Sequence, residues 1–132
     1  MPILEWRENF NIGIGQFDDH HKHLVVLFNT TYDNFVSGLP SEDLGLILEA
    51  LIDYAIYHFN AEERWMTGNG YAQVEEHRKM HNHFKMRVIE IQKDFLHGRN
   101  DASLETLTLL AGWLSNHILV ADADFAEWSA KA

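Results

Sequence analysis

The chain has 132 residues, of which 46% are hydrophobic and 23% charged, and this suits one folded domain with its own core. Its net charge of −10 leaves few cations to neutralise phosphates, so we expect neither nucleic-acid binding nor docking on anionic membranes. The absence of cysteine excludes disulfides, iron–sulfur clusters and thiol catalysis. Histidine is unusually frequent: there are nine, against 10 lysines and arginines together.

The sequence gives no sign of a membrane span or a secretion signal. Charged residues and His58 interrupt the most apolar stretch, residues 44–59, so it is not expected to cross a membrane. The first ten residues include Glu5 and Glu8 and do not resemble a signal peptide. We therefore expect a cytoplasmic protein, and a chain without thiols is compatible with that compartment.

The first third of the chain predicts an arm followed by a helix. Residues 1–17 lack a sustained period and predict an extended arm that packs on the body through its aromatic side chains. Asp18 or Asp19 then supplies an N-cap for a helix over about residues 19–36. Apolar residues recur in this segment at helical spacing, and His21 lies at the centre of their stripe.

Three further segments show the 3.6-residue period of amphipathic helices, over about residues 42–66, 71–97 and 103–121. Ser41 and Ser103 are the expected N-caps of the second and fourth helices. Short links make neighbouring helices antiparallel, and no segment alternates as a strand does. The sequence therefore predicts an all-α fold, an up-down-up-down antiparallel four-helix bundle with an N-terminal extended arm, as a single domain over residues 1–132.

Each predicted helix carries at least one histidine on its apolar face; the five are His21, His58, His77, His81 and His117. A single such histidine is usually a core residue bonded to a backbone carbonyl. Burying five of them with Glu62, however, would need a separate partner for every polar atom, at about 1–3 kcal/mol for each one missed. Metal coordination uses all of them together, so the pattern predicts a metal site inside the bundle.

The donor types narrow the choice of metal without settling it. Five histidines with two carboxylates, Glu62 and Asp122, are too many for one ion and suit two. Imidazole combined with carboxylate favours iron, copper or zinc over magnesium or calcium. The zinc-protease motif is absent because Arg78, not glutamate, follows His77. The Glu-x-x-His pairs of ferritin-like di-iron proteins are absent too.

Motifs along nearly the whole chain resemble those of the hemerythrins, most closely the single-domain bacterial members, the bacteriohemerythrins. They are Trp6, Gly13-Ile14, Asp18-x-x-His21-Lys22, His58-Phe59-x-x-Glu62-Glu63-x-x-Met66, Gly70-Tyr71, His77-x-x-x-His81 and Trp113-Leu114-x-x-His117-Ile118-x-x-x-Asp122. The resemblance implies a non-haem centre of two iron ions that binds one O2. The ligands that it implies are His21, His58, Glu62, His77, His81, His117 and Asp122.

The resemblance also implies how the ligands are divided. It assigns His77, His81 and His117 to a fully coordinated iron, and His21 and His58 to the iron that binds O2. Counting coordination positions independently supports a centre that keeps a vacancy for O2. Two octahedral irons offer about twelve coordination positions. The histidines fill about five of them, the two bridging carboxylates about four and a bridging oxide or hydroxide about two, so about one position stays open.

Two features depart from the simplest pattern. His20 stands where bacterial relatives usually carry glutamine, and helical geometry rotates it by roughly 100° from His21, so we expect a solvated residue or a neighbour of a ligand rather than a ligand. His117 and Asp122 are five residues apart, about 140° out of line on an ideal helix. Their convergence requires a widened turn or a helix end near Ala121.

Four apolar residues flank the predicted ligands and are expected to form ordinary core and, at the same time, a dry pocket for O2: Phe59, Trp113, Leu114 and Ile118. A pocket of this kind keeps water away from the metal and from a bound gas. Ile118 is the residue that we expect to form the wall of the pocket.

The resemblance predicts reversible O2 binding, for oxygen storage, transport or delivery, rather than an enzyme. With every predicted carboxylate already bridging, no general base stands beside the O2 position. Two alternatives remain: an O2 or redox sensing module, which would need a partner chain, and a di-iron enzyme with peroxidase-like or nitric-oxide-consuming activity. The apolar faces are used in the bundle core, so we expect a monomer, with an unidentified oxygen-consuming partner.

Overall fold

The computed structural model describes residues 3–6, 8–38 and 40–131, and all regular structure within them is helical. Residues 1, 2 and 7 of the predicted arm, residue 39 of the first link and the last residue of the predicted domain lie outside the described residues. The helices are α1 (Gly15–Val36), α2 (Ser41–Gly68), α3 (Val74–Leu96), α4 (Asn100–His117) and α5 (Ala123–Lys131). A short 3-10 helix, η1 (Glu8–Phe10), lies in the arm, and a π-helical segment, η2 (Ile118–Asp122), joins α4 to α5.

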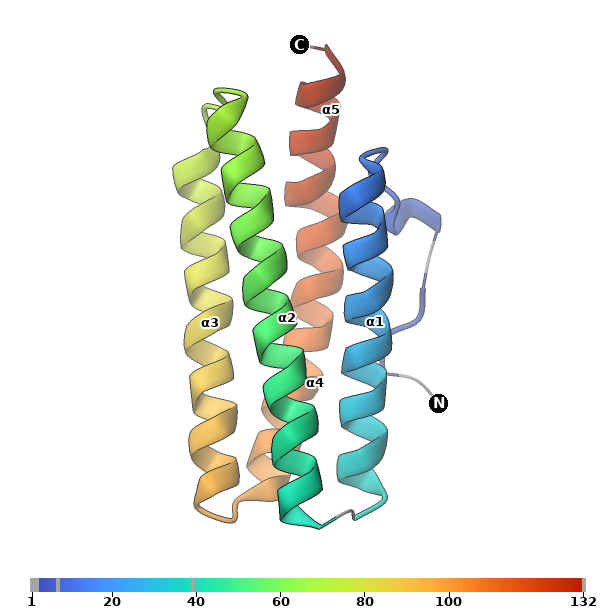
Figure 1. The fold of residues 1–132 in the computed structure, drawn as a ribbon, viewed down its shortest axis with the longest axis vertical. Helices are drawn as coiled ribbons and strands as arrows, with labels where there is room; N and C mark the ends of the chain where they lie inside the picture. The colour runs from blue at the N-terminus through green and yellow to red at the C-terminus, as the bar shows by residue number, and fades with distance from the viewer. Residues whose placement is uncertain (1–2, 7, 39, 132) are drawn as a thin grey trace.

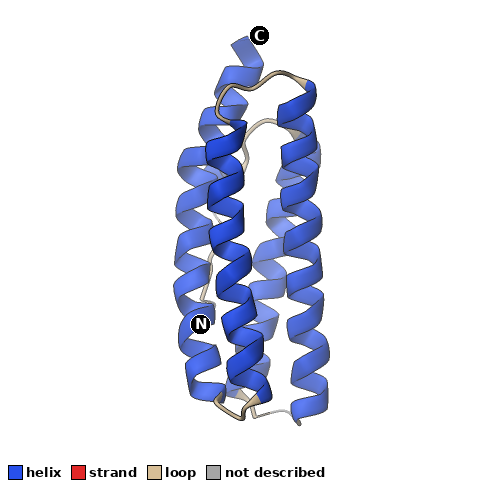
Figure 2. Cartoon of the chain, turned by 90° about the vertical axis from the view of Figure 1, so that its left-hand side faces the viewer, coloured by secondary structure: helices blue, strands red, loops and turns tan. Residues whose placement is uncertain are grey.

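Four antiparallel helical columns form the bundle, which confirms the predicted all-α fold (Figure 1). α1 packs on α2, α2 on α3, α3 on α4 and α4 back on α1. The links between helices lie at the two ends of the bundle (Figure 2). α4, η2 and α5 follow one another as a single rod that extends past the other helices (Figure 1). Within the described residues, no helix has both the length and the apolar character needed to cross a membrane.

The arm runs beside α1 and is fastened to it by side chains of that helix (Figure 1). The Asn29 amide group donates to the Leu4 carbonyl over 2.8 Å and accepts from the Leu4 N–H over 3.0 Å. Asp18 Oδ1 accepts the Ile12 N–H at 2.6 Å. The predicted N-cap at Asp18 or Asp19 is wrong, because α1 begins at Gly15 with Ile14 in the N-cap position. Asp18 lies in the first turn and connects the helix to the arm.

Ser103 also has a different role from the predicted one. α4 begins at Asn100, so Ser103 lies inside the helix rather than at its N-cap. The side chain is fully buried, and its hydroxyl donates to the Ile91 carbonyl of α3 over 2.9 Å. The residue therefore joins two helices instead of capping one. At the start of α2, Pro40 occupies the N-cap position that was predicted for Ser41.

Glycines end the helices at the links. Gly70 and Gly98 follow the C-caps Asn69 and His97 and have φ values of 71° and 73°. This left-handed conformation turns the chain out of a helix and is costly for residues with a Cβ atom. The antiparallel return of α3 and α4 therefore depends on glycine at these two positions.

The core consists of two apolar clusters with a polar layer between them. The larger cluster fills the body of the bundle, and a smaller one, made of Phe17, Ala61, Met66 and Phe125, lies around the turn from α2 to α3 and the start of α5. On α1, His21 stands between Phe17 of the small cluster and Leu24 of the large one. On α2, Glu62 stands between Phe59 and Met66 in the same way. The predicted ligands are thus enclosed by apolar side chains on both sides.

Candidate metal centre

All seven predicted ligands meet in one buried layer. Relative exposures are 0% for His21, His58, Glu62, His81 and Asp122, 3% for His77 and 4% for His117. The residues come from α1, α2, α3, the end of α4 and η2. Charged and polar side chains are rarely buried so completely unless they are paired or bind a metal.

The donor atoms form two groups that share both carboxylates. One group is Glu62, His77, His81, His117 and Asp122; the other is His21, His58, Glu62 and Asp122. Within each group, one possible ligand atom of every residue lies within 4.8 Å of the others. This division into three and two histidines is the one that the family resemblance implies.

Asp122 faces both groups with different oxygens. Its Oδ1 lies 2.8 Å from His77 Nε2 and 3.2 Å from His117 Nε2. Its Oδ2 lies 3.3 Å from His21 Nε2. A carboxylate placed in this way can bridge two cations, one on each oxygen.

Glu62 also stands between the groups. Its Oε1 lies 3.1 Å from His58 Nε2 and 3.4 Å from His81 Nε2, and its Oε2 lies 4.0 Å from His77 Nε2. The shared donor set therefore has one carboxylate from α2 and one from η2, with imidazoles on either side.

The π-helical segment η2 explains how His117 and Asp122 converge. On an α-helix a five-residue spacing would leave the two side chains about 140° apart. Residues 118–122 instead form a π-helix, whose i→i+5 hydrogen bonds widen the turn by one residue. His117 Nε2 and Asp122 Oδ1 are consequently 3.2 Å apart. The predicted widened turn near Ala121 is confirmed.

The distribution of unpaired polar atoms shows that the layer fits a metal. Among the described residues, six buried side-chain nitrogen or oxygen atoms lack a hydrogen-bond partner, and all six belong to predicted ligands. They are His21 Nε2, His58 Nε2, both oxygens of Glu62, His117 Nδ1 and Asp122 Oδ2. Each such atom costs about 1–3 kcal/mol when it is left unpaired in a protein interior. Five of these six atoms, all except His117 Nδ1, lie close to atoms of the other proposed ligands. A cation between them would satisfy these five atoms together.

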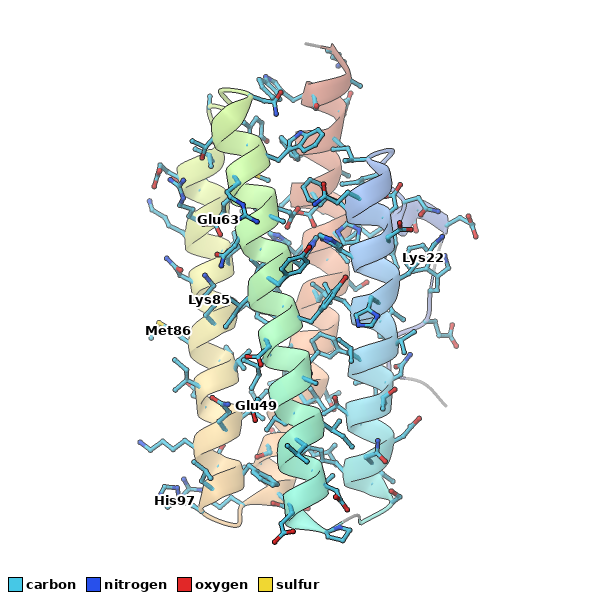
Figure 3. All side chains as sticks on the ribbon, viewed as in Figure 1. Lys22, Glu49, Glu63, Lys85, Met86 and His97 are labelled. Carbon is cyan, nitrogen blue, oxygen red and sulfur yellow. The ribbon has the colours of Figure 1, made fainter. Side chains whose placement is uncertain are left out.

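Contacts outside the layer orient two of the rings. The Nδ1–H of His21 donates to the backbone carbonyl of Phe10 over 3.0 Å. The Nδ1–H of His81 faces Glu63 Oε2 at 3.4 Å, and Glu63 in turn pairs with Arg78 at 3.3 Å, between α2 and α3 (Figure 3). A proton on Nδ1 leaves the Nε2 lone pair free to bind a metal. The sequence pattern gave no indication of these partners, apart from the presence of Glu63 in the motif of α2.

His20 lies beside a ligand and is not a member of either donor group. Its exposure is only 7%, and its Nδ1 lies 2.8 Å from Nδ1 of His58. Of the two alternatives raised from the sequence, a solvated residue or a neighbour of a ligand, the structure supports the second. Burial, and then the neighbouring His21, lower the pKa of His20, so the ring is neutral near neutral pH.

Burial also sets the charges of the layer. It lowers the pKa of His58 well below the ordinary range, and that of His81 to about 4, so both rings offer neutral nitrogen lone pairs at neutral pH. Burial, together with the negative charge of Asp122, raises the pKa of Glu62 well above its usual value. Burial would raise the pKa of Asp122 as well, but the charge and hydrogen bonds of His117 and other histidines outweigh it, and the net shift is strongly downward. The neutral rings of His58 and His81, together with the ionised carboxylate of Asp122, offer donor atoms to a cation.

Aromatic rings pack directly on the ligands. Phe59 stacks on His81 with ring centroids 4.0 Å apart, and Trp113 stacks on His117 at 4.7 Å. Leu114 and Ile118 are fully buried in the larger apolar cluster. Phe17, assigned from the sequence to the arm, belongs to α1 and meets His58 edge-on at 5.9 Å. The layer is therefore shielded from water. It stays a prediction that an O2 pocket is enclosed by Phe59, Trp113, Leu114 and Ile118.

Comparisons with known proteins agree with the fold and with a cation-binding domain. The family model described as the hemerythrin HHE cation binding domain matches residues 12–128. A bacteriohemerythrin of Methylococcus capsulatus is 33% identical over 92% of this chain and 93% of its own length, and one of Pseudomonas paraeruginosa is 35% identical over 96% and 82%. A crystal structure of wild-type hemerythrin superposes with a TM-score of 0.85 at 30% identity, covering 94% of this chain and 95% of the other. The chain is therefore a member of the hemerythrin family.

Proposed function

We propose that the buried layer holds two iron ions and that the protein binds O2 reversibly, for oxygen storage, transport or delivery. The observation that carries the proposal is the inequality of the two donor groups. Both use Glu62 and Asp122, but one adds three histidines and the other only two. Two metal ions held by these groups would thus differ by one protein ligand.

The group with fewer donors is the one suited to an external molecule. A metal site that reacts with a small ligand must keep a coordination position that the protein does not fill. An ion next to His21 and His58 would keep such a position, because this group offers one histidine fewer. Imidazole and carboxylate donors together suit iron, and two ferrous ions supply the two electrons that reversible O2 binding requires.

The surrounding residues favour release of O2 over chemical turnover. The proposed ligands Glu62 and Asp122 are shared between the two groups, and the nearby Glu63 is already engaged by His81 and Arg78. None of these three carboxylates is left as a free general base beside the position for O2. Apolar side chains on both sides of the layer keep water away from the bound gas.

The names of the relatives support an oxygen-binding role, because several are called bacteriohemerythrins. We further propose that the chain acts as a cytoplasmic monomer and gives up O2 to an oxygen-consuming partner. The alternatives from the sequence are a sensing module and a di-iron enzyme acting on peroxide or nitric oxide. Steady consumption of either substrate with a reductant would favour the enzyme.

The test measures iron per chain and the visible spectrum of the reduced protein under O2 and under argon. We expect about two irons per chain and a ligand-to-iron absorption band that appears with O2 and disappears under argon. His58→Ala should lower the iron content to about one per chain, because it removes a donor from only one group. His97→Ala is the matched control, since His97 is exposed and lies at the end of the bundle far from Glu63 (Figure 3). Two irons retained in His58→Ala would contradict the proposal.

A further inference from the structure

His20 is a buried ring whose one ring-to-ring hydrogen bond goes to a proposed ligand. The two Nδ1 atoms of His20 and His58 are 2.8 Å apart, and the rings meet edge-on with centroids 5.0 Å apart. His20 lies on the side of His58 opposite to Nε2, which approaches Glu62. It therefore contacts the ligand from behind and not the donor layer itself.

The contacts of His58 favour one position for its ring proton. A hydrogen bond between two Nδ1 atoms needs one donor and one acceptor. His58 Nε2 has no aligned hydrogen-bond partner, although Glu62 Oε1 is 3.1 Å away, whereas its Nδ1 has one. The consistent arrangement places the proton on His58 Nδ1, with His20 Nδ1 as acceptor.

Aromatic side chains hold His20 in this orientation. The rings of Phe17, Tyr54 and Tyr57 surround it, with centroids 5.8, 5.8 and 5.3 Å from its own. A ring held in this way presents its lone pair to His58 without further ordering. It loses little conformational entropy when His58 donates to it.

We propose that His20 is a positioning residue: it accepts the Nδ1–H of His58 and so directs the Nε2 lone pair of that ring toward the metal. The inference rests on the proposed metal centre and adds a residue to it. It gives His58 the kind of support that His21 receives from the Phe10 carbonyl and His81 from Glu63. Partners of this kind set the orientation and basicity of a metal-binding imidazole.

The acceptors differ in charge between the two groups. His81, of the group with three histidines, faces the carboxylate of Glu63, while His58, of the group with two, faces a neutral ring. A charged acceptor strengthens a hydrogen bond about twofold and makes the imidazole a stronger ligand. An ion next to His58 would thus have fewer protein donors, and its His58 ligand would be less basic than His81, so removal of His20 should affect this ion first.

The test compares His20→Leu, which removes the acceptor, with His20→Gln, whose amide oxygen can accept the same proton. Ferrous iron is titrated anaerobically against a competing chelator. We expect His20→Leu to weaken one of two iron sites by about 10–100-fold and to leave the other unchanged. His20→Gln should keep both sites within about threefold of wild type, and so should the exposed control His97→Leu. Unchanged affinity in His20→Leu, or equal losses in the Leu and Gln variants, would overturn the proposal.

A second measurement needs no metal. Nitrogen-15 NMR of the metal-free protein reports which nitrogen of His58 carries the proton. We expect Nδ1–H in wild type and His20→Gln, and a shift toward Nε2–H in His20→Leu. Nε2–H in the wild type would refute the positioning role. A wild type that binds no iron but shows the Nδ1–H form would refute the proposed function alone, so the two failures can be told apart.

Discussion

Replacement of Glu62 by glutamine tests whether the buried layer is built for a metal at the expense of stability. Glu62 is fully buried, and neither of its oxygens has a hydrogen-bond partner. In the metal-free protein we therefore expect Glu62→Gln to be more stable than wild type. With iron present the order should reverse, because the amide no longer supplies the charge that both donor groups share.

The size of the gain follows from the environment of the carboxylate. An unpaired buried polar group costs about 1–3 kcal/mol, and more when it is charged. Burial and the adjacent Asp122 both raise the pKa of Glu62, so each disfavours its ionised form. A neutral amide avoids the like-charge repulsion while filling the same volume, and a gain of about 2 kcal/mol is expected at neutral pH.

Urea denaturation of chelator-treated protein measures this difference at several pH values. Because the folded-state pKa of Glu62 is raised, the folded wild type takes up a proton before the unfolded chain does as pH falls. The wild type therefore gains stability relative to the variant on acidification, and the gap should narrow. Glu49→Gln is the matched control, an exposed glutamate of the same helix (Figure 3). A metal-free Glu62→Gln protein less stable than wild type at neutral pH would refute the reasoning.

Two further predictions concern acid sensitivity and a contact between helices. Burial lowers the pKa of His81 from 6.5 to about 4, so the unfolded chain binds its proton first and stability falls as pH drops through this range. At about 1.4 kcal/mol per pH unit, the advantage of metal-free wild type over His81→Gln should shrink by about 3 kcal/mol between pH 7 and 4 in denaturant titrations, and a constant difference would contradict the assignment. Ser103→Ala leaves the buried Ile91 carbonyl without its hydroxyl donor and should cost about 1–2 kcal/mol in urea unfolding. The exposed Thr108→Ala should cost less, and equal costs would argue against a role for burial.

Periodicity predicted the interior of each helix better than its ends. The apolar stripes placed His21, His58 and His81 on buried faces because burial follows the 3.6-residue repeat. The ends depend on which local hydrogen bond forms, and Asp18 and Ser103 each offered a plausible cap that a tertiary contact replaced. Capping propensity alone does not decide between such partners.

The convergence of the proposed ligands could be predicted because they are side chains of a recognisable motif, but the groups that support them could not. The five-residue spacing of His117 and Asp122 was enough to require a widened turn, which η2 provides. The angle of His20 on α1 places it off the face of the proposed ligands, as expected, but its burial depends on Tyr54 and Tyr57 of α2, which the pattern of α1 alone does not reveal. The Phe10 backbone carbonyl carries no sequence signal at all.

The contact of the Phe10 carbonyl with His21 makes the segment ahead of the bundle an outer support of the centre. Trimming this segment, or pulling on it with a bulky fusion, would loosen the ring of His21 before it disturbed the four helices. Tags used to study the protein therefore belong at the other end of the chain. Through the same hydrogen bond, a molecule that binds to the N-terminal arm and moves Phe10 would also move His21, a ligand of the iron proposed to bind O2.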